Sequence, residues 1–212
     1  MRTKAARLRW IQFGSAGIDA AIRHGVPTGV MLTNAGSAWA PTVAEHAFAL
    51  LLGLARKLHD FERLRAAASW QRDTMTDTVS SLDGGRLLVL GFGPIGREVS
   101  RRADAFGMRT IAIATTPRDH PLVERVAATS DLAALLPAAD AIVIALPLTP
   151  ATRHLISSRE LSLCKRSALI VNVARGAIID SVALLDALMS DRIGGAGLDV
   201  FPDEPLPADN PL

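Results

Sequence analysis

The 212-residue sequence predicts an α/β protein built around a doubly wound parallel sheet. Six short apolar runs lie between residues 86 and 200, and helix-like patterns separate most of them. The runs are continuously apolar and do not alternate with polar residues, which indicates strands buried on both faces. Strands of this kind, joined by helices, form a parallel sheet that helices cover on both sides.

The segment before residue 40 has a different pattern from the rest of the chain. It predicts two short strands, at 8–13 and 30–33, and little else. Two strands cannot bury a core of their own, so this segment must pack against something else. A helical pattern follows from Thr42 to about residue 70. We therefore expect a remnant of one domain over 1–40 and a second domain over 41–212, which opens with this helix.

The elements of the second domain alternate in order along the chain. Strands are expected at 87–90, 110–113, 126–128, 141–146, 168–173 and 197–200. Helices are expected at 95–105, 131–136, 159–163 and 181–189. Asp180 precedes the last of these helices, where a carboxylate can accept hydrogen bonds from the free N–H groups of the first turn. This alternation makes a complete doubly wound sheet of six strands.

A glycine-rich turn joins the first strand of this sheet to its helix. It reads Gly91-Phe92-Gly93-Pro94-Ile95-Gly96. The first glycine permits a tight turn, the second lets a pyrophosphate approach the backbone, and the third lets the helix pack close to the strand. The helix N-terminus then presents N–H groups and partial positive charge to the phosphates. The turn predicts a Rossmann domain that binds a dinucleotide.

The residues after the second strand bear on which dinucleotide binds. An NAD site usually has an acid there, which hydrogen-bonds the ribose 2′-hydroxyl. This chain has Thr115, Thr116 and Arg118, and no carboxylate before Asp119. Hydroxyl groups and a guanidinium suit a 2′-phosphate better. The sequence therefore favours NADP over NAD, with a solvated Arg118 as the alternative interpretation.

Composition and charge narrow the range of functions. The formal net charge is +2, and no long block of Lys and Arg of the nucleic-acid-binding kind is present. No apolar run approaches the roughly 18 residues that a membrane span needs. The single cysteine, Cys164, cannot form an internal disulfide and is expected to be a buried helix residue. We expect a cytoplasmic protein that binds neither nucleic acid nor membranes, and the sequence suggests no metal site.

Several segments together resemble the D-isomer-specific 2-hydroxyacid dehydrogenases. Besides the glycine turn, they are 15–19, 33–36, 43–46, 147–150, 172–176, 197–201 and 204–206, which occur in the family's order. The resemblance implies a Rossmann domain, a flavodoxin-like substrate domain, and reduction of a 2-keto acid by NAD(P)H or the reverse reaction. It leaves the acid open among glyoxylate, hydroxypyruvate and bulkier acids. It also implies a homodimer built on the long helix and the cofactor domain.

The resemblance implies a role for three charged residues. Arg175 matches the family's arginine, which binds the substrate carboxylate and polarises the keto oxygen. Glu204 matches the glutamate that raises the pKa of a catalytic histidine, with Asp203 as the competing carboxylate. Asp199 is expected to accept a hydrogen bond from the nicotinamide carboxamide.

Further contacts follow from the same resemblance. Backbone N–H groups around Ala16, Gly17 and Ile18 are expected to hold the substrate carboxylate. Cofactor contacts are expected from Pro147, Thr149, Val173 and Ala174. Trp39 and Trp70 could border the substrate site, but core packing is the stronger expectation for both.

One family feature is missing from the sequence. The catalytic histidine of the family lies in a Pro-His pair after the glutamate, and no histidine here follows a proline; the five are His24, His46, His59, His120 and His154. The opening βα units of the family are also missing before Leu8. We therefore expect the substrate domain to be cut at both ends and the cofactor domain to be whole. The alternatives are an incomplete oxidoreductase chain, a non-catalytic NAD(P)-binding module or assembly partner, and a degenerate fragment that folds poorly.

Overall fold

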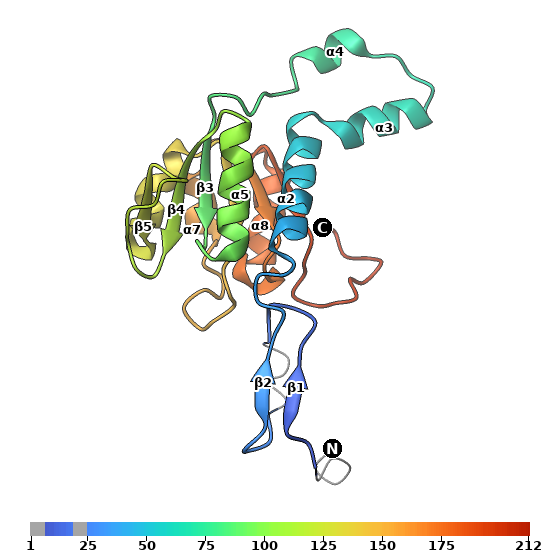
Figure 1. Cartoon of the computed structure of the whole chain (residues 1–212). Helices are drawn as coiled ribbons and strands as arrows, with labels where there is room; N and C mark the ends of the chain where they lie inside the picture. Colours follow the sequence, from blue (N-terminus) through green and yellow to red (C-terminus); the bar gives the residue numbers. More distant parts are fainter. Residues whose placement is uncertain (1–6, 19–24) are drawn as a thin grey trace.

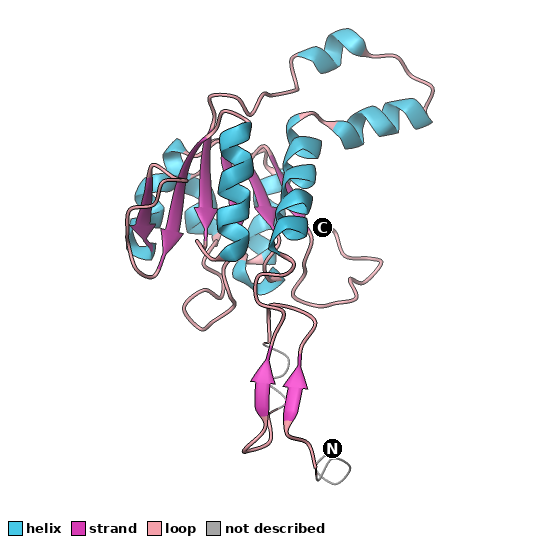
Figure 2. Cartoon of the chain, in the orientation of Figure 1, coloured by secondary structure: helices cyan, strands magenta, loops and turns pink. Residues whose placement is uncertain are grey.

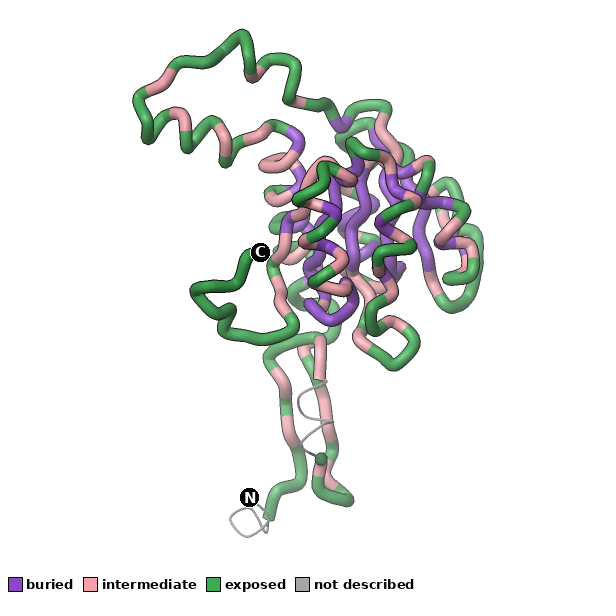
Figure 3. The backbone as a smooth tube through the Cα atoms, turned by 180° about the vertical axis from the view of Figure 1, so that it is seen from behind, coloured by how far each residue is buried: buried purple, intermediate pink, exposed green. Residues whose placement is uncertain are grey.

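The computed structural model describes residues 7–18 and 25–212. Figure 1 shows three parts: a central α/β body, a narrow two-stranded extension that carries the N-terminal segment, and an arm of two short helices on the opposite side of the body. Figure 3 shows that the buried residues lie almost entirely in the central body, whereas the extension and the arm are exposed or half-buried.

The central body contains the expected parallel sheet of six strands. The strands are β3 (Arg86–Leu90), β4 (Arg109–Ala114), β5 (Arg125–Ala128), β6 (Ala141–Ile144), β7 (Leu169–Asn172) and β8 (Gly195–Leu198). Their spatial order is β5-β4-β3-β6-β7-β8, and every neighbouring pair is parallel. This is the doubly wound Rossmann order, and it confirms the predicted fold class. Strand β8 begins two residues earlier than expected, so Asp199 lies just beyond the strand.

Helices cover both faces of the sheet (Figure 2). One face packs against α2 (Ala40–Ala55) and α5 (Pro94–Ala105), and the other against α6 (Leu132–Leu135), α7 (Ser158–Leu163) and α8 (Ser181–Met189). Successive residues of a strand serve opposite faces: Leu87 belongs to the α2–α5 core and Leu88 to the other core. Two-sided burial explains why the strands are continuously apolar.

The start of α8 follows the local sequence signal. The Asp180 carboxylate accepts hydrogen bonds from the N–H groups of Val182 at 3.0 Å and Ala183 at 3.2 Å, so it caps α8 as expected.

Cys164 lies just after α7 and is 3% exposed, as expected for a buried thiol. Burial raises the pKa of the Cys164 thiol to about 11, so this cysteine stays protonated at neutral pH.

The long helix predicted to residue 70 is wrong in its second half. It ends at Ala55, and Lys57 adopts a left-handed φ of 52° before α3 (Leu58–Ala66) starts in a new direction. The carbonyl of Ala55 instead accepts a hydrogen bond from the N–H of the returning Ser80 at 2.8 Å. The helix breaks where its contact with the sheet ends, since α3 has no buried residue.

The arm consists of α3, a connecting turn and α4 (Arg72–Thr76). Trp70, at its bend, is 89% exposed, and Trp39 before α2 is 53% exposed. The expectation that both tryptophans pack in a core is therefore wrong. Trp39 instead donates a hydrogen bond from Nε1 to the carbonyl oxygen of Gly14 at 2.6 Å, which fastens the N-terminal segment to the start of α2.

The N-terminal segment forms a separate sheet of two parallel strands, β1 (Trp10–Gln12) and β2 (Met31–Thr33). Both strands are largely uncovered, and Met31 is 65% exposed. Such apolar exposure fits a segment that packs against another element. The division into domains at residue 40 stays a prediction.

Candidate functional site

The turn between β3 and α5 has the backbone that the glycine motif predicts. Gly91 has a φ of 105°, and a Cβ there would lie 2.6 Å from the carbonyl oxygen of Ala145. A Cβ on Gly96 would overlap the carbonyl oxygen of Gly91. Both positions therefore require glycine, because backbone packs directly on backbone.

Gly93 differs from these two glycines because its missing Cβ faces open space. Nothing lies within 4 Å of a Cβ built there, and Gly93 borders a cavity of about 290 Å³. Gly93 is also the N-cap of α5, a helix end that no side chain caps. Pro94 and Ile95, in the first turn of this helix, border the same cavity. The open space and the uncapped helix end together fit a pyrophosphate.

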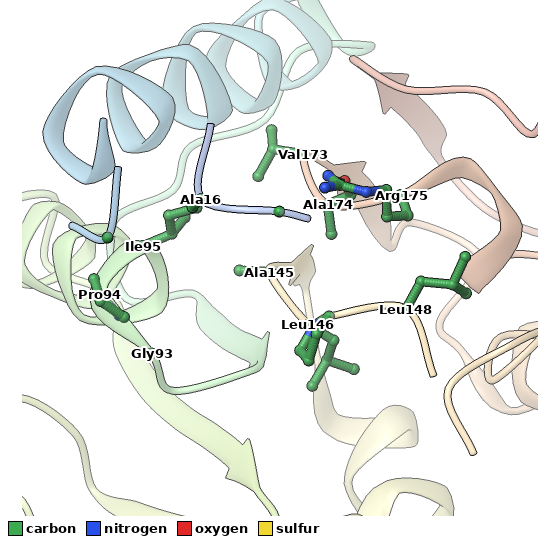
Figure 4. Close-up of a pocket in the computed structure, with 13 residues that line it drawn as sticks. Ala16, Gly93, Pro94, Ile95, Ala145, Leu146, Leu148, Val173, Ala174 and Arg175 are labelled. Atoms are coloured by element: carbon green, nitrogen blue, oxygen red, sulfur yellow. Dashed lines mark hydrogen bonds between the residues drawn. The ribbon is translucent and has the colours of Figure 1, made fainter. Parts of the chain in front are cut away.

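The cavity lies where the carboxyl ends of β3, β6 and β7 meet (Figure 4). Its lining comprises Ala16, Gly17, Gly36, Gly93, Pro94, Ile95, Ala145, Leu146, Pro147, Leu148, Val173, Ala174 and Arg175. Strands β3 and β6 are neighbours in the sheet but not in the sequence. The order of the strands reverses at this point, and open α/β sheets bind their ligands at such a crevice.

Arg175 stands at the end of β7 on a turn that a buried amide holds. The Asn172 side chain, which is 1% exposed, donates from Nδ2 to the carbonyl oxygen of Arg175 at 3.0 Å and accepts at Oδ1 from the N–H of Ala174 at 3.0 Å. The guanidinium itself donates from Nη1 to the carbonyl oxygen of Ala174 at 2.6 Å. Asn172 therefore fixes the backbone that carries Arg175. The match of segment 172–176 to the family did not predict this role for Asn172.

The N-terminal segment closes over Arg175. A Cβ built on Gly17 would overlap the guanidinium, so the backbone of this residue lies directly against it. The Asn34 side chain donates from Nδ2 to the carbonyl oxygen of Ala16 at 2.8 Å, which ties this turn to the end of β2. The predicted substrate-binding backbone and the predicted arginine are thus brought together, although 158 positions separate residues 17 and 175 (175 − 17 = 158).

A second cavity of about 580 Å³ also borders Arg175. It shares Gly17, Leu148 and Arg175 with the first cavity. Its full lining is Ser15, Gly17, Leu148, Arg153, Arg175, Gly176, Ala177, Phe201, Pro202, Asp203 and Glu204. Glu204 accepts a hydrogen bond at Oε1 from the N–H of Phe201 at 2.9 Å. The structure therefore brings Arg175 and Glu204 to one cavity.

Arg118 lies beside the glycine turn, as its predicted role requires. Its guanidinium carbon is 5.6 Å from the centre of the Phe92 ring, and Nη2 is 3.4 Å from the carbonyl oxygen of Phe92. Arg97 of α5 lies over the same ring at 5.8 Å, and the His120 ring meets it edge-on at 4.9 Å. These groups gather at the end of β4 next to exposed Thr115 and Thr116. Arg97 and His120 were not predicted, because only the fold brings them to Phe92.

Asp199 has a partner that the sequence did not reveal. His46 on α2 lies with Nε2 at 3.1 Å from Oδ1 of Asp199. Both side chains are about half exposed, at 48% and 45%. Asp199, just beyond β8, is thereby linked to the helix that packs across β7 and β8.

The remaining predicted residues divide into two groups. Pro147, Val173 and Ala174 line the first cavity. Ile18, Thr149 and Asp199 are not among the residues that line either cavity. Thr149 instead lies in a turn, where its N–H donates to Oγ1 of Thr152 at 2.8 Å.

No histidine is among the described residues that line the two cavities. His24 lies outside the described residues. Within 7–18 and 25–212, His, Cys, Asp and Glu form no group that could hold a metal ion. Every helix in these ranges falls short of the length and apolar character that a membrane span requires.

Comparison with known proteins gives consistent matches. Residues 48–212 match the family model for the NAD-binding domain of D-isomer-specific 2-hydroxyacid dehydrogenases. Glyoxylate reductase of Thermococcus gammatolerans is 36% identical over 207 residues, which are 95% of this chain and 62% of that protein. The chain therefore spans less than two thirds of the length of this relative.

Solved structures agree with the sequence matches. A D-isomer-specific 2-hydroxyacid dehydrogenase family protein from Aeromonas salmonicida is similar at a TM-score of 0.88 and 35% identity, over 98% of this chain and 66% of that one. A D-lactate dehydrogenase from Aquifex aeolicus, complexed with NAD and lactic acid, is similar at a TM-score of 0.82 and 32% identity, over 94% of this chain and 60% of that one. The chain belongs to the D-isomer-specific 2-hydroxyacid dehydrogenase family.

Proposed function

We propose that this chain serves hydride transfer between NAD(P)H and a 2-keto acid, which yields a D-2-hydroxy acid. One observation carries the proposal: the cavity at the phosphate-binding turn shares Arg175 and Gly17 with the second, more polar cavity. A dinucleotide along the first cavity would supply the hydride next to an acid held in the second. The relatives, a glyoxylate reductase and a D-lactate dehydrogenase bound to NAD and lactic acid, support this reading.

Arg175 and the adjoining backbone would bind the acid. A guanidinium offers two parallel N–H groups to a carboxylate, and it polarises a nearby keto oxygen. The turn at Ala16, Gly17 and Ile18 would add backbone N–H groups, and Gly17 gives the close approach that this needs. Binding through both groups would orient the keto carbon for attack.

Glu204 would support the proton donor. In the second cavity it can accept a hydrogen bond from a protonated histidine, which holds the histidine's pKa up so that a proton is available at neutral pH. Asp199 would accept a hydrogen bond from the nicotinamide carboxamide, with His46 keeping its carboxylate in place. The buried Cys164 suits a reducing compartment such as the cytoplasm.

A second candidate function is a non-catalytic NAD(P)-binding module. The open space beside the uncapped first turn of α5 would accept a dinucleotide whether or not a reaction follows. Mixing the protein with NADPH and glyoxylate distinguishes the two functions. Loss of the reduced-nicotinamide absorbance supports the oxidoreductase. Saturable cofactor binding without turnover supports the module.

We further propose that the preferred cofactor is NADP, bound with its 2′-phosphate near Arg118, Thr115 and Thr116. Arg118→Glu should weaken NADPH binding about 10- to 100-fold, because a charge-assisted contact becomes a repulsion. NADH binding should change about threefold at most. The exposed Arg109, at the amino end of β4 and away from the glycine turn, provides the matched control, Arg109→Glu. Equal losses of NADPH and NADH affinity would contradict the assignment.

We also propose a homodimer, formed by α2 and the arm. Leu58, Phe61 and Trp70 on the arm are exposed, at 57%, 41% and 89%, and the arm encloses a hollow of about 630 Å³. An apolar arm that projects from the body fits a surface covered by a second subunit. Light scattering should give twice the chain mass, and Phe61→Ser with Trp70→Ser should shift the protein toward the monomer. A monomeric wild-type protein at micromolar concentration would contradict this.

A further inference from the structure

Arg153 is a second arginine on the cavity that holds Arg175 and Glu204. Its side chain is exposed, and within the described part of the chain it makes no hydrogen bond or ion pair. Some exposed arginines are engaged, Arg65 with Glu62 and Arg101 with Glu98, whereas others, such as Arg159 and Arg166, make no such contact among the described residues. Arg153 differs from these because it lines a polar cavity. A guanidinium on a polar cavity that lacks a protein anion as partner is available to an anionic ligand.

The backbone on both sides of Arg153 is tightly held. Oγ1 of Thr152 donates to the carbonyl oxygen of Pro147 at 2.7 Å, and the N–H of Arg153 donates to the carbonyl oxygen of Thr149 at 3.0 Å. His154 has a left-handed φ of 51°, and its N–H donates to the carbonyl oxygen of Ala177 at 2.9 Å. The turn that carries Arg153 is thus fastened to the segment just after Arg175. This arrangement fixes where the guanidinium can reach.

The size of the cavity also leaves room for a larger anion. A volume of about 580 Å³ exceeds the need of a two-carbon acid and lies in the range of sites for larger ligands. The two carboxylates of the cavity do not neutralise Arg153. Glu204 accepts the N–H of Phe201, and Asp203 forms no ion pair with Arg153 among the described contacts.

We propose that Arg153 binds a second anionic group of the substrate, a carboxylate or phosphate at the end remote from the keto acid. The proposal rests on the proposed function, since Arg175 must take the first carboxylate. It makes Arg153 a specificity-determining residue that selects dianionic over monoanionic 2-keto acids. The gain comes from a charge-assisted contact, and it should weaken with rising salt because Arg153 is exposed.

Matched pairs of acids test the proposal in the protein loaded with oxidised cofactor, where no reduction occurs. 2-Ketoglutarate and 2-ketovalerate share a five-carbon chain and differ in the terminal carboxylate. 3-Phosphohydroxypyruvate and hydroxypyruvate differ in the phosphate. Titration calorimetry should show about tenfold or greater preference for the dianion in at least one pair. The pair that responds identifies which anion the site takes.

Three variants assign the preference to this side chain. Arg153→Gln should abolish it and leave the affinity for the monoanion within about twofold, and Arg153→Lys should retain part of it. Arg159→Gln, on an exposed arginine of α7 that is not among the residues lining the cavity, should retain all of it. An unchanged melting temperature confirms that the variants fold.

Two results would overturn the proposal: equal affinities within both pairs, or a preference that survives in Arg153→Gln. If the monoanions still bind and Arg175→Met abolishes that binding, the proposed function stands and only the role of Arg153 is lost. If neither acid nor dinucleotide binds, the proposed function falls, and the role of Arg153 falls with it.

Discussion

Arg175→Met should reduce the affinity of the cofactor-loaded protein for 2-keto acids by about 100-fold or more, since a bidentate charge-assisted contact is worth about 3 kcal/mol. The substitution removes the guanidinium while keeping an unbranched side chain of similar length. Dinucleotide affinity should change by less than about threefold, because the phosphate-binding turn lies at the other end of the first cavity. Calorimetry with oxidised cofactor measures both constants.

Two further variants make the test of Arg175 specific. Gly17→Ala places a Cβ on the guanidinium, so it should weaken acid binding while Arg175 is still present. Arg166→Met alters an exposed arginine outside both cavities and should have no effect. If the Arg175→Met variant binds glyoxylate or 2-ketoglutarate as tightly as the wild type, this arginine does not hold the acid.

Gly93→Val should lower the affinity for nicotinamide dinucleotides by about 100-fold or more with little loss of stability. The added side chain enters the open space beside the first turn of α5, where the pyrophosphate is proposed to lie. The backbone of Gly93, at φ −79° and ψ −166°, is extended and accepts any side chain. A melting curve and a cofactor titration of the same sample measure both effects.

Gly96→Ala serves as a comparison, because its direct effect should be on stability. A Cβ there overlaps the carbonyl oxygen of Gly91, which cannot move without separating α5 from β3. We expect a loss of about 1–3 kcal/mol in the free energy of unfolding, as for other overpacked sites. Normal dinucleotide affinity in Gly93→Val would place the phosphates elsewhere.

The sheet could be predicted because its signals are local. Runs such as 141–146 are apolar on both faces, and this follows directly from the helix layers on each side. The glycine turn could be predicted equally well, since a Cβ at Gly91 or Gly96 would meet backbone, whereas Gly93 leaves open space for a ligand. The last strand was placed two residues late, because Gly195, its first residue, lacks an apolar side chain. Gly197 is small because a Cβ there would lie 3.0 Å from Cβ of Leu50 on α2.

The contacts that refine the site could not be predicted in the same way. His46 meets Asp199 across 153 positions (199 − 46 = 153), and Arg97 meets Arg118 only through the Phe92 ring. The break at Lys57 depends on Ser80 returning to Ala55, whereas residues 42–70 by themselves keep a helical pattern. Each of these features is a tertiary contact that overrides or adds to local preference.

The most direct test of the central claim is titration of the purified wild-type polypeptide with NADPH and with NADH, followed by a 2-keto acid. We expect saturable binding of both dinucleotides, tighter for NADPH, and acid binding that depends on a bound dinucleotide and on Arg175. A folded protein that binds neither dinucleotide would contradict the assignment of the cavity at Gly93 as a cofactor site.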